Sequence, residues 1–200
     1  MSVARRRLLA AAAACAALPG RAQQRTGAAR MMDDLMNGRG PIGGPFTLQG
    51  VDGRPVRLAD FSGKVVLLYF GYTGCADVCP TDLVQMARLL SLLGKDAAQV
   101  QPVFVTLDPQ RDTAAVVREY VKSFDARIVG LRGSEAETRR VATAYKVAYE
   151  KVPATRGYFI DHTAFFYLLD PAGRYVAFMP PGTSAERMLA LVKDNLGLLR

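Results

Sequence analysis

Hydrophobic residues along the chain form continuous runs that alternate with stretches of helical period. Residues 65–72 (VVLLYFGY) and 100–108 (VQPVFVTLD) are apolar runs rich in β-branched and aromatic residues, which is typical of strands covered on both faces. Residues 81–93 lie between them and repeat apolar side chains at helical spacing, at positions Leu83, Met86, Ala87, Leu90 and Leu93. The pattern predicts a strand, a helix ending near Gly94 and a second strand.

Two further elements flank this unit. Residues 46–49 and 55–58 lie on either side of an Asp-Gly pair, a strong turn signal, and predict a hairpin. Residues 113–124 have a helical pattern, and Asp112 is expected to be the N-cap of that helix because a short polar side chain there can accept a free backbone N–H.

The last third of the chain predicts a strand, a helix and an irregular segment. Residues 126–131 are a short apolar run. Ser134 and Glu137 have the spacing of a capping box and open a helix that reaches Tyr145. Residues 146–160 follow no regular period and are expected to be irregular.

Residues 162–180 read as two strands joined by an Asp-Pro-Ala-Gly turn, hence an antiparallel pair, and Thr183 with Glu186 is expected to cap a final helix. Alternation of strands and helices implies a parallel core, to which the closing hairpin adds an antiparallel edge. With a cysteine motif directly after the first buried strand, the predicted fold is α/β and thioredoxin-like. It has a central mixed sheet flanked by helices and an N-terminal hairpin.

The first 45 residues lack this pattern. Residues 1–22 combine a basic start with an apolar run of 11 residues and small residues near Ala22, the arrangement of an export signal. That run is shorter than the roughly 20 residues of a membrane span. A buried N-terminal helix is the alternative, and within the export hypothesis a twin-arginine signal and a lipoprotein signal at Cys15 stay open. Residues 23–45 are expected to be a linker or tether and residues 46–200 one domain, exported to the periplasm and either free or anchored to the inner membrane.

The net charge of +8 does not indicate nucleic-acid binding. Four of the basic residues and no acid lie in residues 1–22, so the rest of the chain carries a net +4. These charges are scattered, without a basic stripe or interleaved aromatic residues.

The number and positions of the cysteines favour a chemical role for them over a structural disulfide. Cys15 belongs to the expected signal, which leaves Cys75 and Cys79 in the stretch GYTGCADVCP. An even pair in an oxidising compartment is consistent with a disulfide. A loop of this size would nevertheless stabilise the fold little, because stabilisation grows with the length of chain enclosed. The pair is therefore expected to be a redox couple or part of a metal site.

His162 is the only histidine of the chain and precedes a predicted buried strand. A lone histidine is more often structural, but in a thioredoxin-like sheet this position lies near the cysteine loop. Two thiolates and one imidazole form a soft, low-coordinate set that suits Cu(I) and can hold Cu(II) with a further ligand. A zinc site would usually add a fourth ligand.

Three motifs resemble one known family. GYTGCADVCP, VTLDPQRDT and DHTAFFYLLDPAG occur in this order in the Sco/SenC family, and the resemblance covers about residues 45–199. It implies a thioredoxin-like, membrane-associated copper protein that assists assembly of the binuclear copper centre of cytochrome c oxidase. The copper-bearing oxidase subunit would be its partner and a thioredoxin-like protein its reductant.

The resemblance also implies that Cys75, Cys79 and His162 are the copper ligands and that the two thiols cycle with a disulfide. Two residues depart from the usual family pattern. Gly74 replaces a histidine that is not one of the three ligands, and Ala76 replaces a proline, which is expected to loosen the loop and shift its redox potential.

The remaining polar residues of the motifs each allow two interpretations. Asp112 is a helix cap or contacts copper, and Asp161 orients His162 or ends a turn. Asp108 and Arg111 either guide a partner or pair with each other.

The function expected from these observations is that of a copper metallochaperone with thiol–disulfide activity. The main alternative is a thiol–disulfide oxidoreductase that reduces partner cysteines without carrying copper. The spacing of Cys75 and Cys79, one residue longer than CxxC, and the sole histidine favour metal over redox chemistry alone. A peroxiredoxin is disfavoured because Tyr72 stands where that motif has threonine. A Cys-His hydrolase would leave one cysteine without a role.

Overall fold

The computed structural model describes residues 41–197 of the chain. The expected export signal and all but the last residues of the expected linker lie outside the described residues. No helix within residues 41–197 combines the length and the apolar character needed to cross a bilayer.

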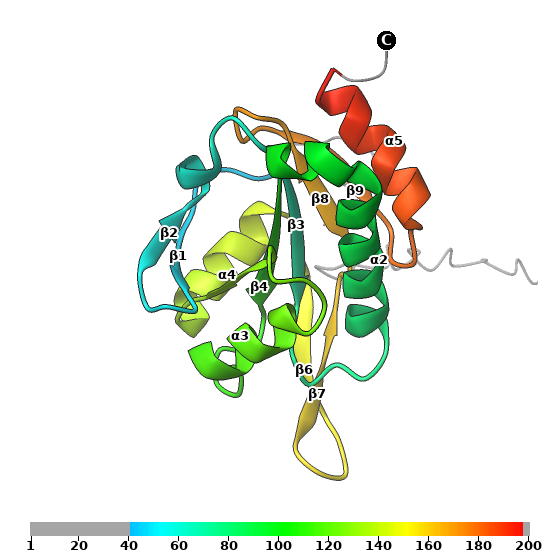
Figure 1. Ribbon diagram of the computed structural model, residues 1–200. Coiled ribbons are helices and arrows are strands. Elements are labelled where there is room, and N and C mark those ends of the chain that lie inside the picture. Colours follow the sequence, from blue (N-terminus) through cyan, green and yellow to red (C-terminus); the bar gives the residue numbers. More distant parts are fainter. Residues whose placement is uncertain (1–40, 198–200) are drawn as a thin grey trace, which may run out of the picture.

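A seven-stranded sheet forms the centre of the molecule, in the order β2-β1-β5-β4-β3-β8-β9 (Figure 1). The pairs β3–β4 and β4–β5 are parallel, and the other neighbours are antiparallel. The sheet is therefore mixed, as the sequence predicts. Its strands are β1 (Thr47–Gly50), β2 (Pro55–Arg57), β3 (Val65–Gly71), β4 (Val100–Thr106), β5 (Val129–Arg132), β8 (Phe166–Leu169) and β9 (Tyr175–Met179).

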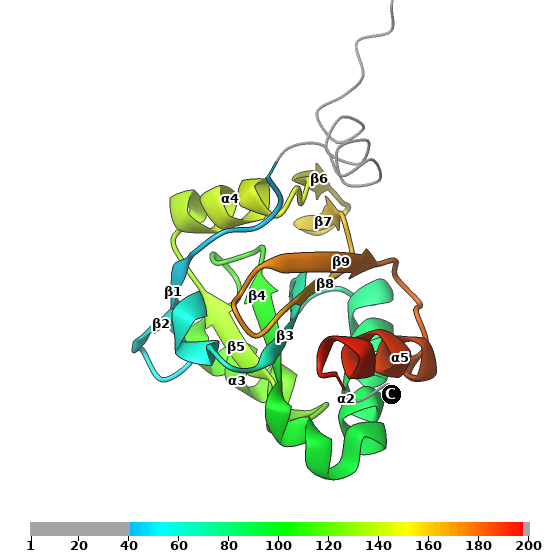
Figure 2. The ribbon, with the colours of Figure 1, turned by 90° about the horizontal axis from the view of Figure 1, so that it is seen from above.

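Helices cover both faces of this sheet (Figure 2). Helices α2, α3 and α5 lie on one face and α4 lies on the other. This layered arrangement confirms the predicted thioredoxin-like fold. The helices are α2 (Val78–Leu93), α3 (Ala114–Lys122), α4 (Glu135–Ala144) and α5 (Ala185–Asn195), with short 3-10 helices η1 (Leu58–Phe61) and η2 (Gly94–Gln99).

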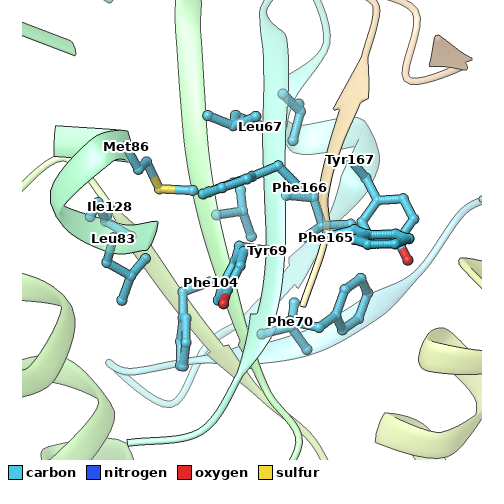
Figure 3. Close-up of a cluster of buried hydrophobic side chains, with 14 of the residues drawn as sticks. Leu67, Tyr69, Phe70, Leu83, Met86, Phe104, Ile128, Phe165, Phe166 and Tyr167 are labelled. Atoms are coloured by element: carbon cyan, nitrogen blue, oxygen red, sulfur yellow. The ribbon is translucent and has the colours of Figure 1, made fainter. Parts of the chain in front are cut away.

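The central strand β3 is buried on both faces along its whole length, because successive side chains point to opposite sides of the sheet. Figure 3 shows Leu83 and Met86 of α2 on one side of the strand and Phe70 and Tyr167 on the other. An unbroken apolar run at residues 65–71 is what such a doubly covered strand requires. The core therefore fixes β3, and the end of β3 fixes where the cysteine loop begins.

Three local expectations are corrected by the structure. Residues 146–160 are not irregular: β6 (Tyr149–Pro153) and β7 (Tyr158–His162) form an antiparallel hairpin outside the main sheet. The cap of α3 is Thr113 rather than Asp112, because the Thr113 hydroxyl accepts the Val116 N–H. In the same way Ser184, not Thr183, caps α5, since the Thr183 hydroxyl donates to the Pro180 carbonyl.

Helix α2 begins three residues earlier than the pattern predicts, at Val78 instead of Thr81. Proline is tolerated in the first turn of a helix, where its missing N–H would have no helical partner. Pro80 therefore does not delay the start of the helix, and Cys79 becomes part of its first turn.

Candidate metal centre

The structure brings together three side chains from three separate segments. Cys75 lies in the loop after β3, Cys79 lies in the first turn of α2, and His162 is the last residue of β7. Their ligand atoms all lie within 4.8 Å of one another, and Cys79 Sγ is 3.5 Å from His162 Nε2. Among residues 41–197 this is the group of Cys, His, Asp and Glu side chains spaced closely enough to hold a metal ion.

The loop between β3 and α2 is shaped by close packing at its start. The Cys75 N–H donates to the Tyr72 carbonyl in a tight turn, 3.3 Å. At Gly71 a Cβ atom would lie 3.0 Å from Cys79 Sγ and 3.1 Å from both the Phe104 and Tyr69 rings. Glycine at this position lets the end of β3 approach the sulfur of Cys79 closely.

The two cysteines have opposite electrostatic environments. The pKa of Cys75 is lowered, first by a hydrogen bond with the Cys79 thiol, then by His162 and by the backbone N–H groups of Asp77 and Cys79. The pKa of Cys79 is raised, first by its hydrogen bond with Cys75 and then by burial. Both thiols are free, Cys79 is buried and Cys75 is partly exposed. The lowered pKa favours the thiolate form of the partly exposed Cys75, and the raised pKa favours the protonated form of the buried Cys79.

This asymmetry predicts selective alkylation of the reduced protein. We expect iodoacetamide to modify Cys75 faster than Cys79, and the rate at Cys75 to stay nearly constant from pH 8 to pH 6. An ordinary thiol, with a pKa near 8.5, would lose about tenfold in rate per pH unit below its pKa. Peptide mass mapping of a pH series measures both rates. A Cys75 rate that falls tenfold per unit would contradict the lowered pKa.

Two residues next to Cys79, Asp82 and Tyr69, are missed by the sequence prediction. Asp82 is fully buried and accepts hydrogen bonds from the Tyr69 hydroxyl, 3.0 Å, and the Gly182 N–H, 2.8 Å, and burial raises its pKa. The Tyr69 hydroxyl also contacts the sulfur of Cys79. The signal that could have revealed this network is an acidic residue on the buried face of α2. Asp82 comes three residues after Cys79 and next to the apolar Leu83.

Asp112 contacts the cysteine loop and not the ligand atoms. Its buried carboxylate accepts the Thr73 N–H, 3.0 Å, and the Thr73 hydroxyl, 2.6 Å, and also the Thr106 hydroxyl. Asp108 and Arg111 form an ion pair, but they do not pair only with each other, because each also bonds to Tyr158.

Asp161 does not orient His162 in this structure. It follows the alternation of β7 and faces Glu150 across the hairpin, on the side opposite to His162. The Nδ1 atom of His162 is buried and has no hydrogen-bond partner among the described residues. The imidazole is held on its other side, where Nε2 lies 3.5 Å from Cys79 Sγ, and by packing of its ring edge-on to Tyr72 at a centroid distance of 6.0 Å.

This donor set on a thioredoxin-like sheet is that of a thiol protein whose site can hold a soft metal ion and whose two cysteines can undergo thiol–disulfide exchange. Residues 35–197 match the SCO1/SenC family model. An SCO2-like protein of Rickettsia felis is 36% identical over 157 residues, which are 77% of each chain. The chain belongs to the SCO1/SenC family.

Solved structures agree with this assignment. Bradyrhizobium japonicum ScoI with copper bound is similar with a TM-score of 0.72 and 42% identity, covering 77% of this chain and 99% of that one. BsSco, described as carrying a disulfide switch and as a member of the Sco family of cytochrome c oxidase assembly proteins, has a TM-score of 0.64 over 79% of this chain and 95% of its own. Its 24% identity shows the fold alone.

Proposed function

We propose that this protein is a copper metallochaperone that delivers copper to the binuclear copper centre of cytochrome c oxidase. The observation that carries the proposal is the convergence of Cys75, Cys79 and His162 within 4.8 Å. Two sulfurs and one imidazole match the preferences of Cu(I) and, with imidazole as the harder donor, of Cu(II). The copper-bound structure of the 42% identical ScoI supports the same cargo here.

The three ligands would have distinct roles. Cys75 supplies a thiolate that needs no deprotonation near neutral pH, because its pKa is lowered by Cys79. Cys79 would bind copper by giving up its proton, which the cation makes favourable by attracting the thiolate. A three-coordinate copper leaves one side open, and the partly exposed Cys75 marks the side from which an acceptor ligand would enter.

The partner in this proposal is the copper-bearing subunit of cytochrome c oxidase. Its support is family membership together with a site from which copper can leave by ligand exchange. Once copper has left, the same two thiols would form a disulfide by exchange with a disulfide of a partner protein, which takes up the two electrons and leaves as two thiols. A thioredoxin-like reductant would then restore Cys75 and Cys79. Ala76 in the exposed part of this loop is expected to alter the potential of that couple.

Copper titration of the reduced protein and its oxidised form tests the proposal. We expect one copper ion per reduced chain and no tight binding after oxidation to the Cys75–Cys79 disulfide, because thiolates are the strong ligands for soft copper. Chelator competition with Cu(I) and Cu(II), in the presence of Zn²⁺, measures both forms. Stoichiometric zinc that copper does not displace would refute the copper assignment.

A thiol–disulfide oxidoreductase without cargo is the second candidate. The observation that favours it is the pairing of an acidified Cys75 with a buried, protonated Cys79, since an exposed thiolate beside a protected thiol is suited to disulfide exchange. His162 distinguishes the candidates, because exchange between sulfurs does not need an imidazole ligand.

The protein is further proposed to work in the periplasm, with residues 1–22 as an export signal, residues 23–45 as a linker and residues 46–200 as the copper domain. The support is the order of basic, apolar and small residues at the start of the chain. A reporter fused after residue 45 is expected to be exported. If the fusion stays in the cytoplasm, the signal assignment is wrong.

A further inference from the structure

The segment DPQRDT, residues 108–113, connects β4 to α3 and contacts both halves of the proposed copper site. We propose that it positions the two halves separately: Asp112 holds the cysteine loop, and Asp108 with Arg111 holds the hairpin that carries His162. This inference rests on the proposed function for its copper measurements, while its structural part concerns the metal-free protein.

The Asp112 end is joined to the cysteine loop by hydrogen bonds alone. Its carboxylate is almost fully buried and accepts both the N–H and the hydroxyl of Thr73, which lies two residues before Cys75. The same carboxylate accepts the hydroxyl of Thr106 at the end of β4. Because an unpaired buried carboxylate is costly, these bonds hold Thr73 against the end of the sheet.

The other end is joined to the hairpin through Tyr158, the first residue of β7. The Tyr158 hydroxyl donates to the fully buried carboxylate of Asp108, 2.8 Å. Arg111 also donates to Asp108, and its Nη1 donates to the Tyr158 carbonyl, 2.8 Å. The guanidinium carbon lies 3.8 Å from the centre of the Tyr158 ring, a cation–π distance. The side chain and the backbone of Tyr158 are thus both fixed.

These contacts matter because the hairpin is not part of the seven-stranded sheet. The strands β6 and β7 pair only with each other, and the hairpin projects beyond the end of the sheet (Figure 1). An isolated two-stranded hairpin is marginally stable in water, so its placement depends on side-chain contacts with the rest of the protein. Lys151 adds bonds to Gln110 of the same segment, 2.9 Å, and to Glu135, 3.1 Å.

Tyr158 and His162 lie on the same face of β7, four residues apart, because strand side chains alternate. Fixing Tyr158 therefore fixes the direction in which the imidazole points. Arg111 also lies 5.8 Å from the ring of Tyr72, which itself contacts the His162 ring. Arg111 is thus a positioning residue for His162, and it touches none of the three ligand atoms.

The two ends should affect different oxidation states of copper. Two sulfurs can hold Cu(I) without the imidazole, whereas Cu(II) favours a nitrogen donor. Loosening the hairpin should therefore weaken Cu(II) binding selectively. Loosening the cysteine loop at Asp112 should change Cu(I) binding, Cu(II) binding and the disulfide potential together.

The test compares Arg111→Lys and Tyr158→Phe with Asp112→Asn in the reduced full-length chain. Lysine cannot reproduce the fork of bonds that Arg111 makes, and phenylalanine removes only the bond to Asp108. For both hairpin variants we expect Cu(II) affinity to fall by about 10- to 100-fold, the usual cost of losing support for a ligand. Cu(I) affinity and the equilibrium constant of the Cys75–Cys79 disulfide couple should each stay within about twofold of the wild-type value. The sulfur-to-Cu(II) charge-transfer absorption should change. Asp112→Asn should lower affinity for both ions.

Hydrogen exchange of the metal-free protein tests the structural part of the inference without any copper measurement. Amides of β7 should exchange faster in Arg111→Lys and Tyr158→Phe, and those of the cysteine loop in Asp112→Asn. Arg127→Lys, in the surface ion pair with Asp125, and Tyr175→Phe, at the opposite end of the sheet, are matched controls and should change neither measurement.

Each outcome decides the inference. Equal losses of Cu(I) and Cu(II) affinity in the hairpin variants, or unchanged exchange in β7, would overturn it. If the wild-type chain bound no copper, the proposed function would fail, and the exchange data alone would still show whether the segment positions the two halves. If Arg111→Lys does not fold, Tyr158→Phe, which removes a single oxygen atom, still tests the hairpin contact.

Discussion

Replacing Cys79 with serine is expected to abolish tight copper binding in both oxidation states. Serine oxygen is a hard donor that stays protonated, so the site keeps one sulfur and one imidazole. Losing a ligand should exceed the 10- to 100-fold cost of losing only its supporting hydrogen bond, so we expect a fall of more than about a hundredfold. Chelator competition with each copper ion measures this loss.

The fold should survive this substitution. Serine is close to cysteine in size, and its hydroxyl can bond to Tyr69, which contacts the Cys79 sulfur. We expect an unfolding free energy lower by about 1–3 kcal/mol, the usual cost of burying a polar group with partial compensation. Disulfide exchange should stall as a mixed disulfide on Cys75, because no second thiol resolves it. Cys15→Ser, outside the described domain, is the matched control and should leave copper affinity unchanged.

Replacing His162 with alanine is expected to separate cargo binding from thiol chemistry. Cu(II) affinity should fall by more than about a hundredfold, and Cu(I) affinity should fall less, because two sulfurs remain. Disulfide formation between Cys75 and Cys79 should continue, since exchange needs only the two sulfurs. A paired assay measures copper affinity by competition and exchange with a model thiol.

The cellular result should follow the copper result. We expect His162→Ala to fail in supporting oxidase assembly although its cysteines still cycle. The fold should be kept, since the imidazole makes few bonds: its Nδ1 has no partner among the described residues. If His162→Ala kept wild-type affinity for both ions, a three-ligand site would be wrong and the reductase alternative would take its place.

Much of the fold could be predicted because the signals are local. The apolar, β-rich run at residues 65–71 indicates a strand covered on both faces, and the capping box at Ser134 and Glu137 marks the start of α4 to the residue. Their physical causes, burial and backbone capping, lie within a few residues of each other. The same holds for the candidate cysteines, whose spacing and scarcity made them conspicuous.

The hairpin of β6 and β7 could not be predicted in this way. Residues 146–160 mix charged, apolar and turn-forming residues, and the hairpin is held by Tyr158, whose partners Asp108 and Arg111 lie about fifty positions earlier. The role of Asp112 could not be predicted either. Its position next to a helix indicates a cap, but in the structure its carboxylate accepts hydrogen bonds from Thr73 and Thr106.

The sequence by itself thus determined the order of the strands and helices other than β6 and β7, the thioredoxin-like class and the residue types of the site, because period, capping and composition are properties of neighbouring residues. Only the tertiary structure decided that Cys75, Cys79 and His162 lie within 4.8 Å, that the two thiols have opposite pKa shifts and that the DPQRDT segment contacts both halves of the site. These features arise from distances between segments up to 87 positions apart, from Cys75 to His162, which the chain sets only by folding.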